Sequence, residues 1–185
     1  VTGDSLVASG AMTRLVNDMI SSFLSAFVII FFILAIEFRS IPLGALSMLP
    51  NILPTLLVMG LLGFLHEPIR ASTAVIFAIA IGIAVDDTIH YFVRFAKEMH
   101  VDHDHEAAAR RAMVSSGRAI LFTTLLLTLG MGVLSFSDFV ATRNFGILTG
   151  VTLVTALVAD LVVAPALLVV FRPRIPKSLE EEVGE

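Results

Sequence analysis

The stretch Gly82-Ile83-Ala84-Val85-Asp86-Asp87-Thr88-Ile89-His90 places two adjacent carboxylates and an imidazole in a predominantly apolar run that starts at Ala71. An ionised side chain at the centre of a bilayer costs a few kcal/mol, so such residues usually face the interior of a helix bundle or a wet cavity. On a helix, Gly82, Asp86 and His90 recur every four residues and share one stripe. Asp87 lies about 100° round the helix from Asp86, and Gly82 would let a neighbouring helix approach closely one turn from the acid. The pattern predicts a proton-binding site within a membrane-spanning helix.

The composition of the whole chain is that of an integral membrane protein. Of the 185 residues, 57% are hydrophobic and 15% are charged, whereas soluble domains average about 25% charged residues. The mean hydropathy is +0.94. The chain has no cysteine, which excludes disulfides and thiol chemistry, and no basic face with aromatic partners that would indicate nucleic-acid binding. It starts without an initiator Met or a signal peptide, and we expect it to belong to a longer protein.

Five apolar segments predict the fold class, an all-α polytopic membrane protein with a bundle of five transmembrane helices. Each segment has about 18 residues or more, which is enough to cross a bilayer. Pro50 and Pro54 bracket Asn51 and predict a kink in the second helix. The predicted spans are residues 19–36, 43–65, 71–92, 119–136 and 145–171.

More polar segments flank the spans. We expect residues 1–18 to lie outside the bilayer, with Val1 to Gly3 ending a strand and a lead-in helix following it. Residues 94–118 are predicted to be a hydrophilic connector in which Asp102 or Asp104 caps a short helix. Residues 172–185 are predicted to be a disordered cytoplasmic tail.

The distribution of basic residues predicts the orientation, because cytoplasmic segments carry more Lys and Arg. The side that holds the connector and the tail carries nine of them: Arg39, Arg94, Lys97, Arg110, Arg111, Arg118, Arg172, Arg174 and Lys177. The other side carries three: Arg14, Arg70 and Arg143. We therefore expect a cytoplasmic C-terminus and an extracytoplasmic N-terminus in a cell membrane.

The acid pair is suited to carrying protons. Asp86 lies about 12 Å from Arg94 along the helix axis, and therefore in the cytoplasmic half of the membrane. Two neighbouring carboxylates can hold one shared proton near neutral pH and titrate as a unit. His90, one turn nearer the cytoplasm, titrates in a range suited to passing that proton on. Alternatively, the acids only hydrogen-bond to neighbouring helices, and His90 lies at the membrane interface.

Other residues of the spans could join this site. Thr123 and Thr124 lie at a comparable depth in the fourth span, and their hydroxyls would complete a proton relay unless they bond back to their own helix. Asp160 is a further acid in an apolar span, and it either takes protons itself or forms a structural pair. Gly146 and Gly150 form a GxxxG motif, which predicts helix packing.

No metal site and no cofactor are expected, and protons are the expected coupling ion. Histidines and aspartates alternate in the connector, but nothing else converges on them and they lack a fixed ligand geometry. We expect a solvated, helix-capping loop at these residues: His100, Asp102, His103, Asp104 and His105.

Three motifs occur in order along the chain, namely Glu37-Phe38-Arg39-Ser40, Leu49-Pro50-Asn51-Ile52-Leu53-Pro54 and GIAVDDTIHYFVRF at 82–95. Together they resemble the resistance–nodulation–division (RND) superfamily, and within it the MmpL-like branch of hydrophobe exporters, which is related to Patched and to sterol-sensing proteins. The resemblance runs from Val1 to about Phe171. It implies the five last spans of the C-terminal transmembrane half of such a transporter.

The resemblance also implies a function, which is export of lipids or other hydrophobic molecules driven by the proton-motive force. The partners it implies are the other transmembrane half and the extracytoplasmic domains, and a homo-oligomer is compatible with it. The family's proton relay carries over onto Asp86 and Asp87, and its hydroxyl onto Thr123 or Thr124. Many MmpL-like members have Asp-Tyr where this chain has Asp-Asp.

Two other functions are compatible with acids in apolar spans. A sterol- or lipid-sensing module would bind its ligand without pumping, and binding would survive when both acids become Asn. An intramembrane aspartyl protease would need a Gly-x-Gly-Asp sequence around its second acid, which Asp160 lacks. We therefore do not expect an enzyme.

Overall fold

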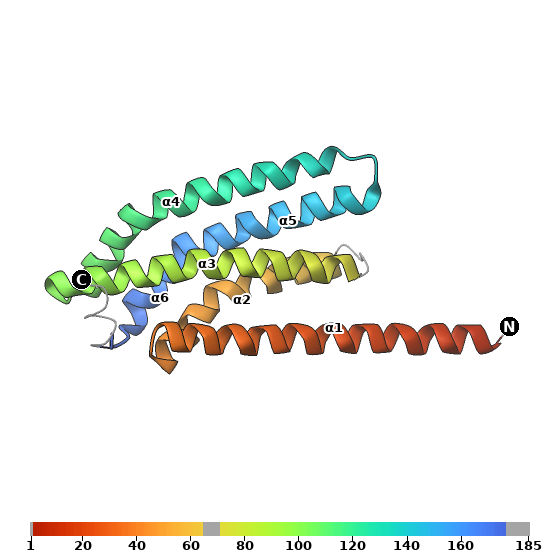
Figure 1. Ribbon diagram of the computed structural model, residues 1–185, viewed down its shortest axis with the longest axis horizontal. Coiled ribbons are helices and arrows are strands. Elements are labelled where there is room, and N and C mark those ends of the chain that lie inside the picture. Colours follow the sequence, from red (N-terminus) through yellow and green to blue (C-terminus); the bar gives the residue numbers. More distant parts are fainter. Residues whose placement is uncertain (1, 65–70, 177–185) are drawn as a thin grey trace.

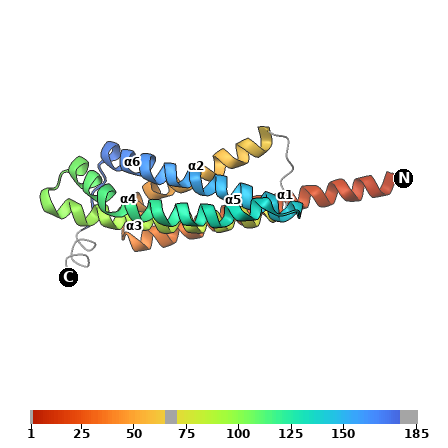
Figure 2. The same cartoon turned by 90° about the horizontal axis from the view of Figure 1, so that it is seen from above.

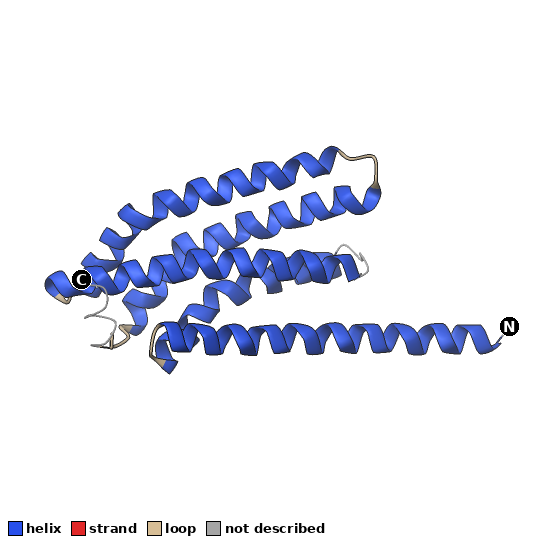
Figure 3. Cartoon of the chain, in the orientation of Figure 1, coloured by secondary structure: helices blue, strands red, loops and turns tan. Residues whose placement is uncertain are grey.

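The computed structural model describes residues 2–64 and 71–176, and the regular elements within these residues are helices (Figures 1 and 3). This result confirms the all-α fold class. In chain order, the elements are α1 (Thr2–Glu37), α2 (Ile41–Phe64), α3 (Ala71–Asp102), α4 (His105–Val133), the 3₁₀ turn η1 (Leu134–Phe136), α5 (Val140–Val158), the π-helical segment η2 (Ala159–Val163) and α6 (Ala164–Phe171).

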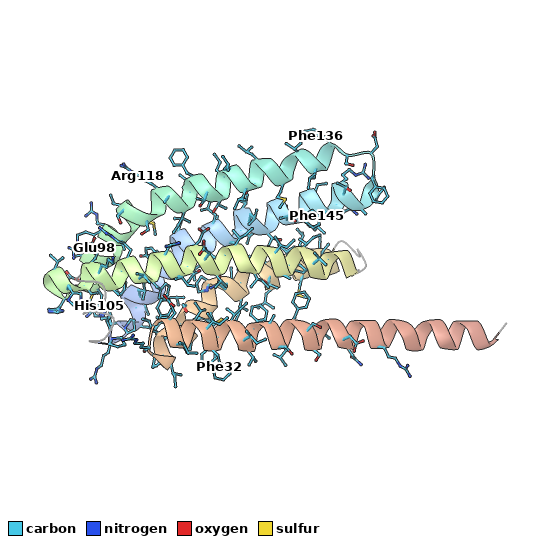
Figure 4. All side chains as sticks on the ribbon, viewed as in Figure 1. Phe32, Glu98, His105, Arg118, Phe136 and Phe145 are labelled. Atoms are coloured by element: carbon cyan, nitrogen blue, oxygen red, sulfur yellow. The ribbon has the colours of Figure 1, made fainter. Side chains whose placement is uncertain are left out.

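Within the described residues, five stretches are long and apolar enough to cross a membrane: Ile20–Glu37, Ile41–Phe64, Val75–Val101, His105–Phe136 and Val140–Phe171. Large apolar side chains remain exposed on their outer faces, including Phe32, Leu126 and Val170. Figure 4 shows Phe32 on the side of α1 that faces away from the other helices. Such faces require lipid or further protein around them. The chain is therefore a multi-pass membrane protein, as its composition predicts.

The N-terminal segment differs from the prediction. The chain is helical from Thr2, so the expected strand is wrong for Thr2 and Gly3, and Val1 lies outside the described residues. No proline occurs between Thr2 and Glu37. Because helix propagation is cooperative, the helix of the first span extends through the more polar lead-in without a break. The N-terminal part of α1 consequently projects beyond the other helices (Figures 1 and 2).

Helix α3 is the central element, in contact with α1, α2, α4 and α5. Its aromatic side chains Tyr91, Phe92 and Phe95 are almost fully buried, and the Phe92 ring lies 5.5 Å from the ring of Phe38 between centroids. The Tyr91 hydroxyl donates a hydrogen bond of 3.2 Å to the Ala109 carbonyl on α4. These contacts fix the rotation of α3 about its axis, and with it the directions in which the acid pair points.

The predicted connector at 94–118 is largely helical, because α3 continues to Asp102 and α4 already begins at His105. Asp104 caps α4 by accepting a 3.0 Å hydrogen bond from the Glu106 N–H, as predicted. The Glu98 carboxylate binds Arg94 and Arg111, each at 2.8 Å, and so ties the ends of the two helices together (Figure 4).

The last span is divided into α5, η2 and α6. In η2 the Ala164 N–H donates to the Ala159 carbonyl, five residues back. Pro165 follows at the start of α6, and since proline has no N–H, a regular α-helical ladder cannot run through this point. Helix α6 ends at Phe171, and its C-cap residue Arg172 has a left-handed conformation with φ of 44°. Of the predicted tail, residues 177–185 lie outside the described residues.

Candidate functional site

Asp86 and Asp87 face different environments on α3. The Asp86 side chain is 73% exposed, and its Oδ1 lies 3.7 Å from Nε2 of His90, one turn further along. Asp87 is buried, and its Oδ2 accepts a 3.0 Å hydrogen bond from the Thr124 hydroxyl on α4. The angle of about 100° between successive helical residues separates the two side chains. The pair thus consists of one open acid and one buried acid.

An open groove of about 650 Å³ lies between α3 and α4, and we call it the acid groove. Asp86, Asp87 and His90 line it from α3, and Thr123 lines it from α4. Arg94 and Lys97 also line it, one and two turns beyond His90. The buried acid therefore has a path to the surroundings of the helices that passes the open acid and the imidazole.

The two threonines that the sequence proposed for the site have different contacts. Thr124 is buried and donates to Asp87. Thr123 is exposed, and its hydroxyl lies 3.0 Å from the Ala119 carbonyl and 3.1 Å from the Ile120 carbonyl of its own helix. A threonine that bonds back in this way has its proton engaged. Of the two, Thr124 is the one that contacts an acid.

Asp160 lies away from the acid groove, in η2, and is 2% exposed. Its Oδ1 lies 2.6 Å from the Thr88 hydroxyl on α3. The same hydroxyl is 3.3 Å from Oδ1 of Asn51 on α2. Thr88 follows Asp87 directly, so Asp160 approaches α3 from a different side than Thr124 does.

Thr88 and Asn51 were not predicted from the sequence to be members of a site. Both are almost fully buried, and Asn51 also donates from its amide nitrogen to the Ser47 carbonyl at 2.8 Å. The signal in the sequence was a polar side chain within an apolar span: Asn51 directly after the first proline of the PNxxP motif, and Thr88 next to the acid pair. Asn51 was interpreted only as part of a kinked segment.

The three glycines differ in their surroundings. A Cβ at Gly146 would lie 2.7 Å from the Met131 carbonyl oxygen, so this glycine permits close contact between α5 and the end of α4. At Gly150 the nearest atom is Cγ2 of Thr128 at 3.9 Å, an ordinary contact. Gly82 has no atom within 4 Å of such a Cβ among the described residues, so the close helix approach expected there does not occur within this part of the chain.

The arrangement can bind protons at two buried carboxyl groups. A threonine hydroxyl donates to an ionised carboxylate and accepts from a protonated one, so a Thr–Asp pair keeps a hydrogen bond in both states. Asp86 and His90 are the titratable side chains that line the acid groove beside Asp87. In residues 2–64 and 71–176 no three His, Cys, Asp or Glu side chains come together as metal ligands.

The fold and the site define a class of protein, a polytopic helical membrane protein with ionisable groups between its spans. The sequence profile of the MMPL family matches residues 1–182. The chain belongs to the MMPL family, within the RND superfamily, and the resemblance drawn from the motifs is confirmed. Members of this family are transporters, so the chain is not an enzyme.

The similar proteins are also membrane proteins. Over 156 residues, or 84% of this chain and 40% of the relative, the chain is 26% identical to the membrane protein MJ1562 of Methanocaldococcus jannaschii. It is 32% identical over 108 residues to the membrane protein SCO6666 of Streptomyces coelicolor, covering 57% of this chain and 15% of the relative. It is 29% identical over 135 residues to the trehalose monomycolate exporter MmpL3 of Mycolicibacterium smegmatis, covering 69% of this chain and 13% of the relative.

The chain thus spans less than half the length of these relatives. No solved structure matches it.

Proposed function

We propose that this chain is the membrane part of an exporter of lipids or other hydrophobic molecules that is driven by the proton-motive force, with Asp86 and Asp87 as its proton relay. One observation carries the proposal: Asp87 is buried against Thr124 at the inner side of a groove that also holds Asp86 and His90. This combination offers a poorly solvated binding site for a proton together with a polar path to it.

Asp87 is assigned the role of proton carrier. Burial makes the ionised form of a carboxyl group costly unless it is paired, and a second carboxylate next to it adds repulsion. The hydrogen bond from the Thr124 hydroxyl partly offsets the free-energy cost of the ionised Asp87 carboxylate. Binding of one proton therefore relieves both burial and repulsion, which is the property a reversible proton carrier needs.

Asp86 and His90 are assigned the exchange of protons with water in the acid groove. Both side chains are more than two-thirds exposed and lie 3.7 Å apart. An imidazole titrates between pH 5 and 8 in the absence of strong perturbation, so it can accept and release protons at physiological pH. Thr123 lines the same groove but bonds to its own helix, and we assign it no proton transfer.

Thr124 is assigned the coupling of proton binding to helix position. A hydrogen bond to an ionised group contributes about 1.5–3 kcal/mol, roughly twice a bond between neutral groups. Protonation of Asp87 would weaken its bond from Thr124, and with it one contact between α3 and α4. The difference in free energy between the hydrogen bond to the ionised carboxylate and the bond to the neutral carboxyl is sufficient to change the populations of two helix arrangements by about tenfold.

The same proposal includes topology and partners. Nine basic residues on one side against three on the other support a cytoplasmic C-terminus. The more polar composition of residues 1–18, ahead of the first apolar stretch, supports placing them outside the bilayer. The exposed outer faces of the spans support the other transmembrane half of a transporter as a partner. The name of the MmpL3 relative, a trehalose monomycolate exporter, supports a lipid-like substrate.

Transport by the whole protein tests this function. Export of a lipid or an efflux dye should stop in Asp87→Asn at unchanged membrane abundance. Asp138→Asn is the matched control, since this exposed aspartate lies in the loop at the other end of α4. Continued export against a gradient in the double variant of Asp86 and Asp87 would exclude the proton relay.

A second candidate function is a lipid-binding or lipid-sensing module that does not pump. A concave apolar surface of about 620 Å³ along α2 favours it, with lining residues that include Leu49, Leu53, Leu57 and Phe64. In that case, lipid occupancy would survive in the double Asp variant, and the transport assay would detect no proton-dependent export in the unaltered protein either.

A further inference from the structure

Asp160, Thr88 and Asn51 form a second buried polar cluster, which joins η2, α3 and α2 and which we call the Asp160 site. The three side chains are at most 2% exposed. Asp160 lies in the widened turn of η2, five residues before Pro165. A π-type turn within a helix is often found at a functional site. Here the turn accompanies a carboxyl group placed among the apolar cores of three helices.

While Asp160 is ionised, this cluster has more hydrogen-bond acceptors than protons that can be donated to them. Three acceptor oxygens lie around the Thr88 hydroxyl: Asp160 Oδ1 at 2.6 Å, the Ala84 carbonyl at 3.0 Å and Asn51 Oδ1 at 3.3 Å. A hydroxyl has one proton to donate. With an ionised Asp160, that proton is used for the carboxylate, and the contact with Asn51 is left without a hydrogen.

A proton on Asp160 resolves this shortage. The protonated carboxyl donates to Thr88, and Thr88 is then free to donate to Asn51 or to Ala84. The amide of Asn51 cannot turn round to supply the missing proton, because its nitrogen already donates to the Ser47 carbonyl at 2.8 Å. With Asp160 protonated, the hydrogen bonds of the cluster would run in one direction, from the carboxyl group to Thr88 and on to Asn51 or Ala84.

The charged surroundings also favour a neutral Asp160. Helix α2 carries no ionisable residue, and on α3 the ionisable neighbour is another acid, Asp87. Arg143 of α5 lies in its first turn, seventeen residues before Asp160. Arg94 of α3 and Arg111 of α4 both form ion pairs with Glu98. A carboxylate this deeply buried is costly without a cation.

We propose that Asp160 is a second proton-binding site, separate from the acid groove, in which Thr88 and Asn51 hold the protonated carboxyl in place. This inference rests on the proposed function only in that it adds a second proton to the same transport cycle. Because Asp87 and Thr88 are consecutive on α3, a rotation of that helix would move both sites together.

The test is infrared difference spectroscopy of the whole protein in lipid, which reports the C=O stretch of protonated carboxyl groups directly. At neutral pH, we expect a protonated-carboxyl band that is lost in Asp160→Asn and that shifts in Thr88→Val. Thr152→Val is the matched control, because the buried Thr152 donates within its own helix to the Leu148 carbonyl. Where Asp160→Asn fails to fold, the comparison of Thr88→Val with Thr88→Ser decides, since serine keeps the hydroxyl.

Retention of every protonated-carboxyl band in a folded Asp160→Asn variant would overturn the inference, as would an unshifted band in Thr88→Val. Loss of the band when sodium replaces choline at constant pH would also overturn it, because the site would then hold a metal cation. The outcome is independent of the proposed function: the band should persist in Asp87→Asn, whether or not that variant still transports.

Discussion

A methyl group at Gly146 would test the packing that holds α5 against the end of α4. In Gly146→Ala, the Cβ would lie 2.7 Å from the Met131 carbonyl oxygen, 2.8 Å from the Ser135 nitrogen and 2.9 Å from Cβ of Leu134. The first two are backbone atoms, which a change of rotamer cannot move aside, so the two helices must separate. We expect the substitution to lower the free energy of unfolding by about 1–3 kcal/mol, the usual cost of an overpacked contact.

The chain provides a matched control four residues along the same helix. In Gly150→Ala, the new Cβ meets Cγ2 of Thr128 at 3.9 Å, which is an ordinary contact. Both positions lie inside α5, so each substitution gains the same helix propensity, up to about 1 kcal/mol. The difference between the two variants therefore isolates the clash, and we expect Gly146→Ala to be about 1–3 kcal/mol less stable than Gly150→Ala.

The assay is reversible unfolding of the whole purified protein in mixed micelles, with the SDS fraction as denaturant. Two measurements are needed for each variant, the unfolding midpoint and the transport rate of the fraction that remains folded. Equal stability of the two variants would refute the reasoning, because it would mean that α5 does not approach the α4 backbone as closely as the distances at Gly146 require.

Three further predictions concern single side chains. Thr124→Val should abolish proton-driven transport and Thr124→Ser should restore it, whereas Thr123→Val should transport normally; loss of transport in both valine variants would remove the distinction between the two hydroxyls. Arg111→Met breaks a partly exposed ion pair with Glu98 and should cost about 1 kcal/mol of stability or less, an effect that shrinks in high salt; a stability difference independent of salt would contradict the ion pair. Asp104→Ala removes the cap of α4 and should cost about 1 kcal/mol in the same unfolding assay, and Asp104→Asn, which keeps a capping oxygen, should cost less.

The hydrophobic pattern of the sequence was sufficient to predict five membrane helices and the fold class. Residue type alone also marked Asp86, Asp87 and Asp160 as unusual, because the cost of an acid in an apolar span does not depend on the details of the fold. The motif at 82–95, together with the EFRS and PNxxP segments that precede it in order, was specific enough to indicate the RND superfamily. The start of α1 was predicted wrongly as a strand, since local composition does not report how far a cooperative helix extends beyond its apolar part.

Which side chains meet could not be read from the sequence, because it depends on the rotation of each helix and on the depth at which two helices cross. Thr123 and Thr124 are equivalent in the sequence, yet Thr124 alone of the two contacts Asp87, since successive residues point about 100° apart. The same geometry separates Asp86 from Asp87 and brings Thr88 to Asp160 across seventy-two residues of sequence.

The sequence by itself determined that this chain lies in a membrane, which of its segments are apolar enough to span it and which family it belongs to, because these follow from the transfer of side chains into lipid and from local motifs. The tertiary structure decided that one acid of the pair is open and the other buried, that Gly146 rather than Gly82 permits close packing, and that Asp160 meets Thr88 and Asn51. These outcomes depend on contacts between helices. The buried side chains Tyr91, Phe92 and Phe95 of α3 form part of those contacts.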